Sequence, residues 1–201
     1  MFGLPEEADA EGRFSGHGVG RAGTGNPSVR RTTMDGSMLL PEFDHEFGET
    51  RKALERVPED KLDWKPHDKS YSLGQLASHL AEIPNWMGPT VQMELLDLDE
   101  MEYEPLEAST RQELLAAFDA SVAEAREILS QTSGETMMES WSMKYGGEIT
   151  MTMPKAAVIR SFILNHNVHH RAQLGVYLRL LDVPVPGHYG PTADEKEQAQ
   201  A

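Results

Sequence analysis

Two histidines four residues apart, His166 and His170, have the residue type and spacing of a metal-binding pair. They lie on a helical stripe in which the neighbouring turns place apolar residues, Ile163 and Leu174. On one helix face, two imidazoles with this spacing have Cβ atoms about 6 Å apart and can both reach one metal ion at about 2.1 Å. The pattern therefore predicts two metal ligands from one helix.

A third histidine, in an earlier helical segment, can complete the site. His79 follows Leu76 by one turn and precedes Leu80, which places it near the inward face of that segment. Three histidine ligands leave coordination positions open on zinc, nickel or iron, as catalytic sites require. A water or thiol at an open position has a pKa near neutrality and becomes a nucleophile at pH 7. The alternative is that each is a core histidine, hydrogen-bonded to another helix.

The other histidines are weaker candidates. His169 is offset by one position from His170, so we expect it to turn sideways and to contact a neighbouring helix or a metal ligand rather than the metal. His45 lies among acidic residues on what we interpret as a solvated face. The remaining three lie in predicted loops or in the first part of the chain: His67, His188 and His17.

Four helical segments are predicted to position these side chains. Apolar residues recur at three- to four-residue steps from Leu39 to Pro58, from Leu73 to Pro84, from Thr110 to Leu129 and from Pro154 to about Asp182. Pro84 should kink or end the second segment, because proline lacks an N–H and clashes with the preceding turn. In residues 137–153, apolar residues alternate around Gly146-Gly147 and predict a short β-hairpin. The predicted fold class is all-α, an antiparallel four-helix bundle with this hairpin before the last helix.

The chain divides into three regions by composition. Residues 1–37 are rich in glycine, so we expect a disordered extension, or a stretch ahead of a natural start near Met34 or Met38. Residues 38–195 carry the predicted helices and form one domain. Residues 196–201 form a polar tail.

Charge and residue content exclude several classes of function. A formal net charge of −15 argues against binding nucleic acid or an anionic membrane, since both require clustered Lys and Arg. The absence of cysteine excludes disulfides and a cysteine nucleophile, and leaves His, Asp and Glu as metal ligands. No apolar run reaches the length of about 20 residues that a membrane-spanning helix needs, and the first residues are acidic, unlike those of a signal peptide. We therefore expect a cytoplasmic protein. With nucleic acid and membranes disfavoured, we expect its partner to be a small-molecule substrate. The acidic residues 94–107 predict a loop that lacks the ligand pattern of a calcium-binding EF-hand.

The sequence from residue 38 to residue 195 resembles the DinB/YfiT-like family of metal-dependent proteins, which is unrelated to the DNA polymerase that shares the name. The resemblance rests on four stretches: WKPHDKSYSLG (64–74), SLGQLASHLAEIPNWM (72–87), NHNVHHRAQLGVYLRLLDVPVP (165–186) and YGPTADE (189–195). It implies a four-helix bundle, often a homodimer, with a divalent metal bound by three histidines. The matching residues are His79 in helix two and the pair His166 and His170.

The resemblance also implies roles for neighbouring residues and a type of chemistry. Arg171 and Gln173 match the family and would pack or hydrogen-bond behind the ligands. Characterised relatives include transferases and isomerases that use a low-molecular-weight thiol, such as bacillithiol or mycothiol, activated at the metal. Our leading hypothesis is therefore a thiol S-transferase in which the thiol attacks an electrophilic small molecule.

Two other functions fit the same sequence. One is a metal-dependent hydrolase, which would need a carboxylate base near the metal. The other is a non-catalytic, dimeric, metal-binding bundle that acts in a stress response. For a substrate pocket, the candidate lining residues are aromatic, although an aromatic residue in a small bundle is more often part of the core: Trp86, Trp141 and Tyr189.

Overall fold

The computed structural model describes residues 35–199. The disorder expected for the first part of the chain lies outside this range, except at positions 35–37. There the backbone N–H of Gly36 donates a hydrogen bond to the Thr132 carbonyl oxygen at 2.9 Å. A Cβ on residue 36 would clash with the carbonyl oxygen of Leu129, so only glycine allows this close approach. These positions are therefore part of the fold.

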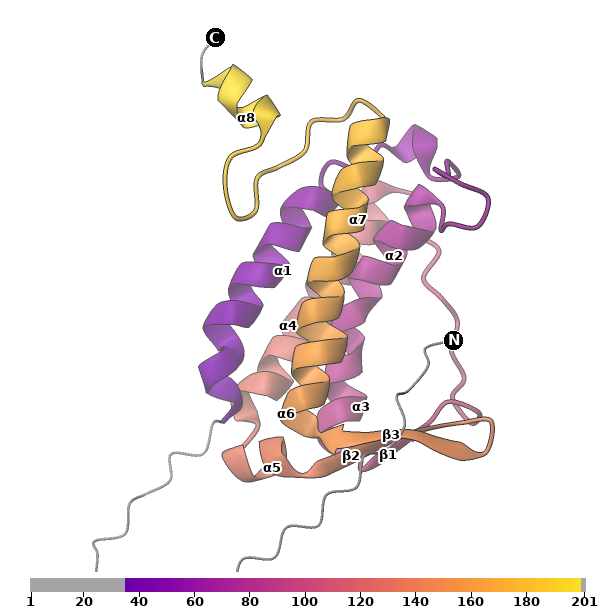
Figure 1. Ribbon diagram of the computed structural model, residues 1–201, viewed down its shortest axis with the longest axis vertical. Coiled ribbons are helices and arrows are strands. Elements are labelled where there is room, and N and C mark those ends of the chain that lie inside the picture. Colours follow the sequence, from indigo (N-terminus) through magenta and orange to yellow (C-terminus); the bar gives the residue numbers. More distant parts are fainter. Residues whose placement is uncertain (1–34, 200–201) are drawn as a thin grey trace, which may run out of the picture. The chain divides into compact units, whose positions relative to one another are not determined.

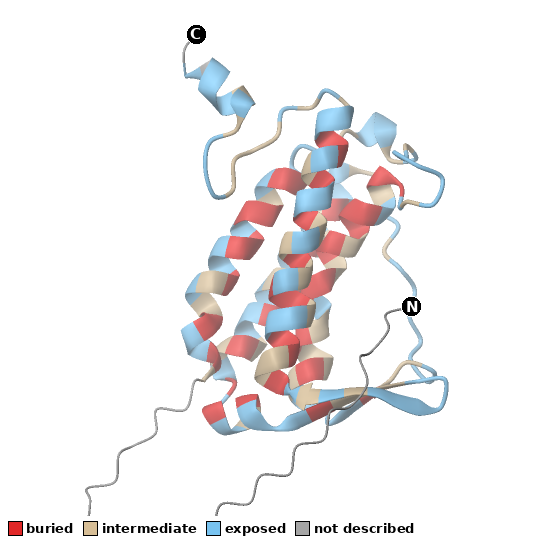
Figure 2. Ribbon diagram, viewed as in Figure 1, coloured by how far each residue is buried: buried red, intermediate tan, exposed pale blue. Residues whose placement is uncertain are grey.

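The described part of the chain is mostly helical and carries one small sheet (Figure 1). Helix α1 packs against α4 and α7, and α2 packs against the same two helices. Figure 2 shows their buried residues, in red, on the sides that face one another. Their apolar faces thus meet in one core, formed by α1 (Leu40–Leu54), α2 (Leu73–Glu82), α4 (Arg111–Gln131) and α7 (His166–Leu180).

Side-chain caps set where the second and third predicted helices begin. Ser72 accepts a hydrogen bond from the Gln75 backbone at 3.2 Å, and the Gln75 side chain accepts one from the Ser72 backbone at 2.9 Å. This reciprocal pair is the capping box that fixes the start of α2. Thr110 likewise accepts from the Glu113 backbone at the start of α4. Each cap satisfies N–H groups that have no partner within the helix.

The segment after α2 is interrupted where the sequence predicts it. The 3₁₀ helix η3 (Ile83–Trp86) contains Pro84, and the short helix α3 (Met87–Gln92) follows. The remaining short helical elements lie mostly in the connections between longer helices: η1 (Gly36–Leu39), η2 (Glu59–Lys61), α5 (Gly134–Met138), α6 (Lys155–Val158) and α8 (Ala193–Gln198). Residues 196–198 of the predicted polar tail therefore belong to α8. Among the helices of residues 35–199, none combines the length and hydropathy needed to cross a membrane.

The last long helical segment is not one regular α-helix. Between α6 and α7 lies a π-helical segment, η4 (Ile159–Asn165), that ends directly before the first histidine of the pair. A π-turn takes up one more residue than an α-turn, and such turns often occur at functional sites. The sequence predicts a continuous helix here, because periodicity alone does not distinguish a π-turn from an α-turn.

The predicted hairpin exists and is part of a three-stranded sheet. Strands β2 (Ser140–Tyr145) and β3 (Glu148–Pro154) pair antiparallel around Gly146-Gly147, whose φ angles of 63° and 79° suit glycine. A third strand, β1 (Leu95–Asp97), pairs parallel to β2 and lies in the segment predicted as a loop. Pairing with a distant strand, which local sequence does not reveal, makes this short segment a strand. The sheet lies at the end of the helices where α6 begins (Figure 1).

A buried ion pair attaches α7 to α1. The guanidinium of Arg171 donates to the Glu46 carboxylate and to the Glu46 carbonyl oxygen, each at 2.7 Å. The Arg171 side chain is 2% exposed and that of Glu46 is 11% exposed. Beside this pair, Asn167 accepts a hydrogen bond from the Thr50 hydroxyl at 2.9 Å. The two helices are thus joined by polar contacts inside an apolar core, which fixes how α7 is rotated about its axis.

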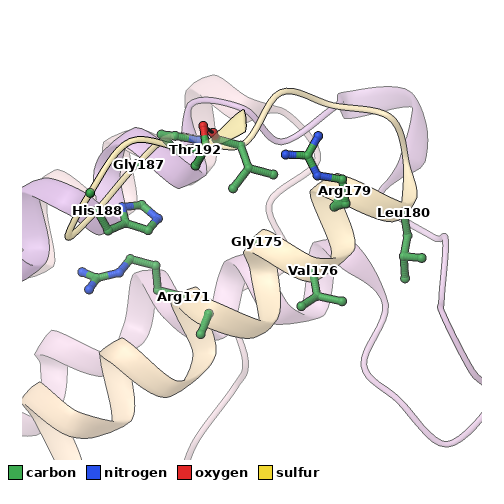
Figure 3. A pocket seen from close by; sticks show the side chains of 12 residues that line it. Arg171, Gly175, Val176, Arg179, Leu180, Gly187, His188 and Thr192 are labelled. Carbon is green, nitrogen blue, oxygen red and sulfur yellow. Dashed lines mark hydrogen bonds between the residues drawn. The ribbon is translucent and has the colours of Figure 1, made fainter. Parts of the chain in front are cut away.

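The chain after α7 turns back over α7 and α1. Tyr189 donates a hydrogen bond to Glu46 and accepts one from Arg171 at 2.8 Å, and His188 lies 3.2 Å from the Glu49 carboxylate. A cavity of about 410 Å³ lies between this loop and α7. Figure 3 shows Arg171 from α7 and His188 from the loop next to one another at this cavity. The loop therefore closes one side of the polar contact between α1 and α7.

The buried pair generates a stability prediction. Replacing Arg171→Met leaves the Glu46 carboxylate buried without its partner, and should lower the free energy of unfolding by about 3–5 kcal/mol in urea denaturation at pH 7. The double variant Glu46→Leu with Arg171→Met removes both charges and should regain most of that loss. Arg179→Met on the same helix breaks the pair with Asp194, in which Arg179 is half-exposed, and should lower the free energy of unfolding far less than Arg171→Met. An equal loss in the single and double variants would refute this account.

Candidate metal centre

Helices α2 and α7 bring the three predicted histidine ligands together. His79 comes from α2, and His166 and His170 come from successive turns of α7. The His166 Nε2 atom lies 3.3 Å from His79 Nε2 and 2.8 Å from His170 Nε2. One nitrogen from each ring lies within 4.8 Å of the others, and all three side chains are partly buried. The structure thus places at one point three residues that are up to 91 positions apart in the chain.

Hydrogen bonds define the protonation of two of these rings. His166 Nδ1 lies 3.3 Å from the Phe162 carbonyl oxygen, which can only accept a hydrogen bond. His170 Nδ1 lies 2.7 Å from the Gln173 side-chain oxygen, which also only accepts. Both rings therefore carry their proton on Nδ1. The Nε2 atoms, with their lone pairs, point toward the centre of the group.

This geometry fits a shared cation. Two unprotonated nitrogens 2.8 Å apart have no hydrogen between them, so their lone pairs repel unless a cation lies at the centre. Two nitrogens bound at about 2.1 Å to one ion, at angles near 90–110°, are about 3.0–3.4 Å apart, close to the distances observed. Imidazole nitrogens suit zinc, nickel and iron. The residues present therefore have the donor set and spacing to hold such an ion.

The electrostatic environment keeps the three rings neutral. Burial, reinforced by the neighbouring His170 and His166 rings, lowers the pKa of His79 to about 4. Burial is also the main cause that lowers the pKa of His166 and of His170. Neutral imidazole is the form that binds metals, so at pH 7 the group is ready to act as a ligand set.

His169 and Gln173 lie next to His170 on α7 and contact one another. The Gln173 side-chain nitrogen lies 3.1 Å from His169 Nε2, while the Gln173 oxygen holds the His170 ring. This chain of contacts runs along the exposed side of α7 and orients His170. Such partners fix the tautomer and the direction of a ligating histidine.

Arg171 and the three aromatic candidates lie at different distances from the group. Arg171 contacts α1 through the buried pair described above, and so acts on the histidines only through the orientation of α7. Trp86 lines a cavity of about 870 Å³ that opens beside His79. Trp141 belongs to β2 and is fully buried, and its indole N–H donates to the Pro89 carbonyl oxygen. Tyr189 belongs to the loop over α1 and α7, and neither it nor Trp141 is among the residues that line this cavity.

Sequence reasoning did not identify two residues that shape this cavity. Glu82 lies one turn after His79 on α2 and accepts hydrogen bonds from the Tyr103 hydroxyl at 2.8 Å and the Leu106 backbone at 3.0 Å. Both Glu82 and Tyr103 line the cavity. The position of Glu82, one turn after His79 on α2, could have been used to predict that it lies near the histidine group. Its partners Tyr103 and Leu106 could not be predicted, because they lie in a segment without helical or strand periodicity.

The lowered pKa of His79 generates a pH prediction for the metal-free protein. The unfolded chain protonates His79 near pH 6.5 and the folded chain near pH 4, so its contribution to stability is present above pH 6.5. It should be lost as the pH falls from about 6.5 toward 4. In urea denaturation with a chelator, His79→Gln should show a smaller fall in unfolding free energy over this range than the wild type. His67→Gln, in an exposed loop, should keep the wild-type slope, and parallel curves for wild type and His79→Gln would contradict the assignment.

Comparison with known proteins identifies the family. The model of the DinB family matches residues 31–200. The uncharacterized protein YrdA of Bacillus subtilis (strain 168) is 25% identical over 157 residues, which are 78% of this chain and 89% of that protein. Solved structures of DinB-like proteins show the same fold at a TM-score of 0.59 and each cover 76% of this chain: YjoA of Bacillus subtilis (16% identity, 99% of its chain) and a protein of Bacillus cereus ATCC 10987 (19% identity, 97% of its chain). Because the family model matches most of the sequence, the chain belongs to the DinB family.

Proposed function

We propose that this protein is a metal-dependent enzyme that transfers a low-molecular-weight thiol to an electrophilic small molecule. In this proposal His79, His166 and His170 hold a divalent ion, which is zinc, nickel or iron. The supporting observation is the convergence of three Nε2 atoms at the edge of a cavity large enough for a small substrate. A divalent ion bound there would lower the pKa of a thiol toward neutrality.

The protein's own residues supply binding and orientation. Phe162 and Gln173 hold protons on the outer nitrogens of His166 and His170, which keeps the inner nitrogens available. Trp86 provides part of the apolar wall of the cavity, against which the apolar body of a substrate can pack. In the transfer, the thiol sulfur forms the new bond to carbon, the leaving group departs with its bonding electron pair, and the thiol proton passes to solvent.

The composition of the group fits thiol transfer. Within residues 35–199, the converging ligand atoms come from the three histidines and include no Asp or Glu oxygen. The chain contains no cysteine, so an incoming thiol would meet no competing protein thiol. A hydrolase would need a carboxylate base near the ion, and Glu82, which lines the cavity together with His79, keeps that alternative open. The other alternative is a bundle that binds the metal without catalysis.

Two structural expectations accompany this proposal. The packing of α1, α2, α4 and α7 around one core supports the predicted antiparallel four-helix bundle. The homodimer stays a prediction, for which sedimentation velocity at several protein concentrations is the direct measurement.

Metal content tests the ligand assignment. Purified wild-type protein, loaded with zinc, nickel or iron and freed of excess ion, should contain about one equivalent by elemental analysis. The variants His79→Ala, His166→Ala and His170→Ala should each lose most of it, since two imidazoles bind far more weakly than three. His45→Ala, on the exposed side of α1, is the matched control and should keep the wild-type content. Wild-type content well below one equivalent would refute the assignment.

An S-transfer assay tests the reaction. We expect the metal-loaded wild type to consume a general electrophile with at least one of several low-molecular-weight thiols, and the three ligand variants to fall to the rate without enzyme. The His45→Ala control should retain activity. Full metal content without transfer to any thiol would replace this proposal with the hydrolase or the non-catalytic alternative.

A further inference from the structure

The cavity beside His79 has the size and walls of a small-molecule site. Its volume of about 870 Å³ lies within the range of roughly 300–1,000 Å³ that is usual for ligand pockets. Apolar side chains form much of its wall: Ile83, Trp86, Leu96, Leu98, Met101 and Leu106. An apolar body, and a flat ring above all, would displace water from such a wall.

The charged residues of this cavity have one sign. Its lining contains four carboxylates and neither Lys nor Arg. Within residues 35–199, these carboxylates take part in none of the ion pairs. They are Glu82, Glu102, Glu104 and Glu107. Negative charges that share a concave apolar surface reinforce one another, because low-dielectric walls focus their field.

Not every acidic residue of the same segment faces the cavity. Asp97 forms an ion pair with Lys144 at 2.6 Å, which ties β1 to β2. Asp99 accepts hydrogen bonds from the backbone of Gly146 and Gly147 at the hairpin turn. Glu94 and Glu100 lie outside the cavity lining. The cavity is therefore distinguished by the position of its carboxylates, together with the absence of Lys and Arg from its lining.

Glu82 anchors residues 102–107, which form one wall of the cavity. Its two oxygens accept the hydrogen bonds from Tyr103 and from the Leu106 backbone, so residues 102–107 are attached to α2 beside His79. Burial, with the Glu82 hydrogen bond, raises the pKa of Tyr103 to about 12, which keeps its hydroxyl a donor at neutral pH. The carboxylates and His79 thus face one space.

We propose that this cavity binds small molecules that join an apolar, ring-containing body to a positively charged ammonium group, and that it discriminates against anions. The carboxylates attract the ammonium, the Trp86 face adds a favourable surface for a cation, and an anion would find no cationic side chain to replace its lost hydration. This substrate class deepens the proposed function, on which it rests for the chemistry performed in the cavity.

Three probes with one skeleton test the preference. Binding of 4-phenylbutylamine, 4-phenylbutan-1-ol and 4-phenylbutanoate to the full chain is measured by calorimetry at pH 7.5, with and without a chelator. We expect the amine to bind about tenfold more tightly than the alcohol, and the carboxylate more weakly than either. The preference should shrink in 1 M salt, where charges are screened within about 3 Å. Equal binding of amine and carboxylate, or no binding of the amine, would overturn the proposal.

Charge-matched variants separate the cavity from the net charge of the protein. The triple variant Glu102→Gln, Glu104→Gln and Glu107→Gln should lose most of the roughly tenfold preference for the amine and keep its affinity for the alcohol. The control triple variant Glu94→Gln, Glu100→Gln and Glu124→Gln removes the same charge from residues that do not line the cavity, and should keep the preference. An equal loss in both triple variants would overturn the proposal.

The two proposals fail in different measurements. Loss of metal binding or of thiol transfer would refute the proposed function and leave the ammonium preference measurable with a chelator present. Tight binding of the carboxylate probe under the same conditions would refute the ammonium preference, whatever the metal content.

Discussion

The guanidinium of Arg171 determines which way α7 faces, and the histidine group depends on that orientation. Arg171 reaches the carboxylate and the carbonyl oxygen of Glu46 on α1, and it is almost fully buried. Neighbouring residues of an α-helix are about 100° apart around its axis. With Arg171 turned to α1, the preceding residue, His170, is directed away from α1 and meets His79 on α2.

Helix α7 thus carries two polar stripes. They differ in whether all of their polar groups find hydrogen-bond partners within the protein. The first, Asn167 and Arg171, finds both donors and acceptors on α1. The second, His166 and His170, has its outer nitrogens satisfied and its inner lone pairs turned toward one another. A polar group that is buried without a partner is costly. The second stripe is therefore the one that calls for a cation from outside the chain.

Local sequence patterns predicted the features that depend on residues close together in the chain. The four-residue spacing of His166 and His170, the Ser72 cap and the glycine turn of the hairpin are of this kind. Features that depend on distant partners were not predictable. Strand β1 exists through its pairing with β2, and Glu82 acquires its role through Tyr103. Likewise, the residue type of Arg171 does not reveal that its partner is on α1 rather than among the histidines.

The π-helical segment η4 sets the relative direction of the two ends of the last long helical segment. It joins the buried Val158, which packs with the sheet, to His166, which meets α2. A π-turn takes up one more residue than an α-turn, and each residue of an α-helix advances the direction of the side chains by about 100°. A regular α-helix with the same number of residues would therefore rotate His166 by about 100° relative to Val158. The wider turn allows one helical segment to face the sheet at one end and α2 at the other.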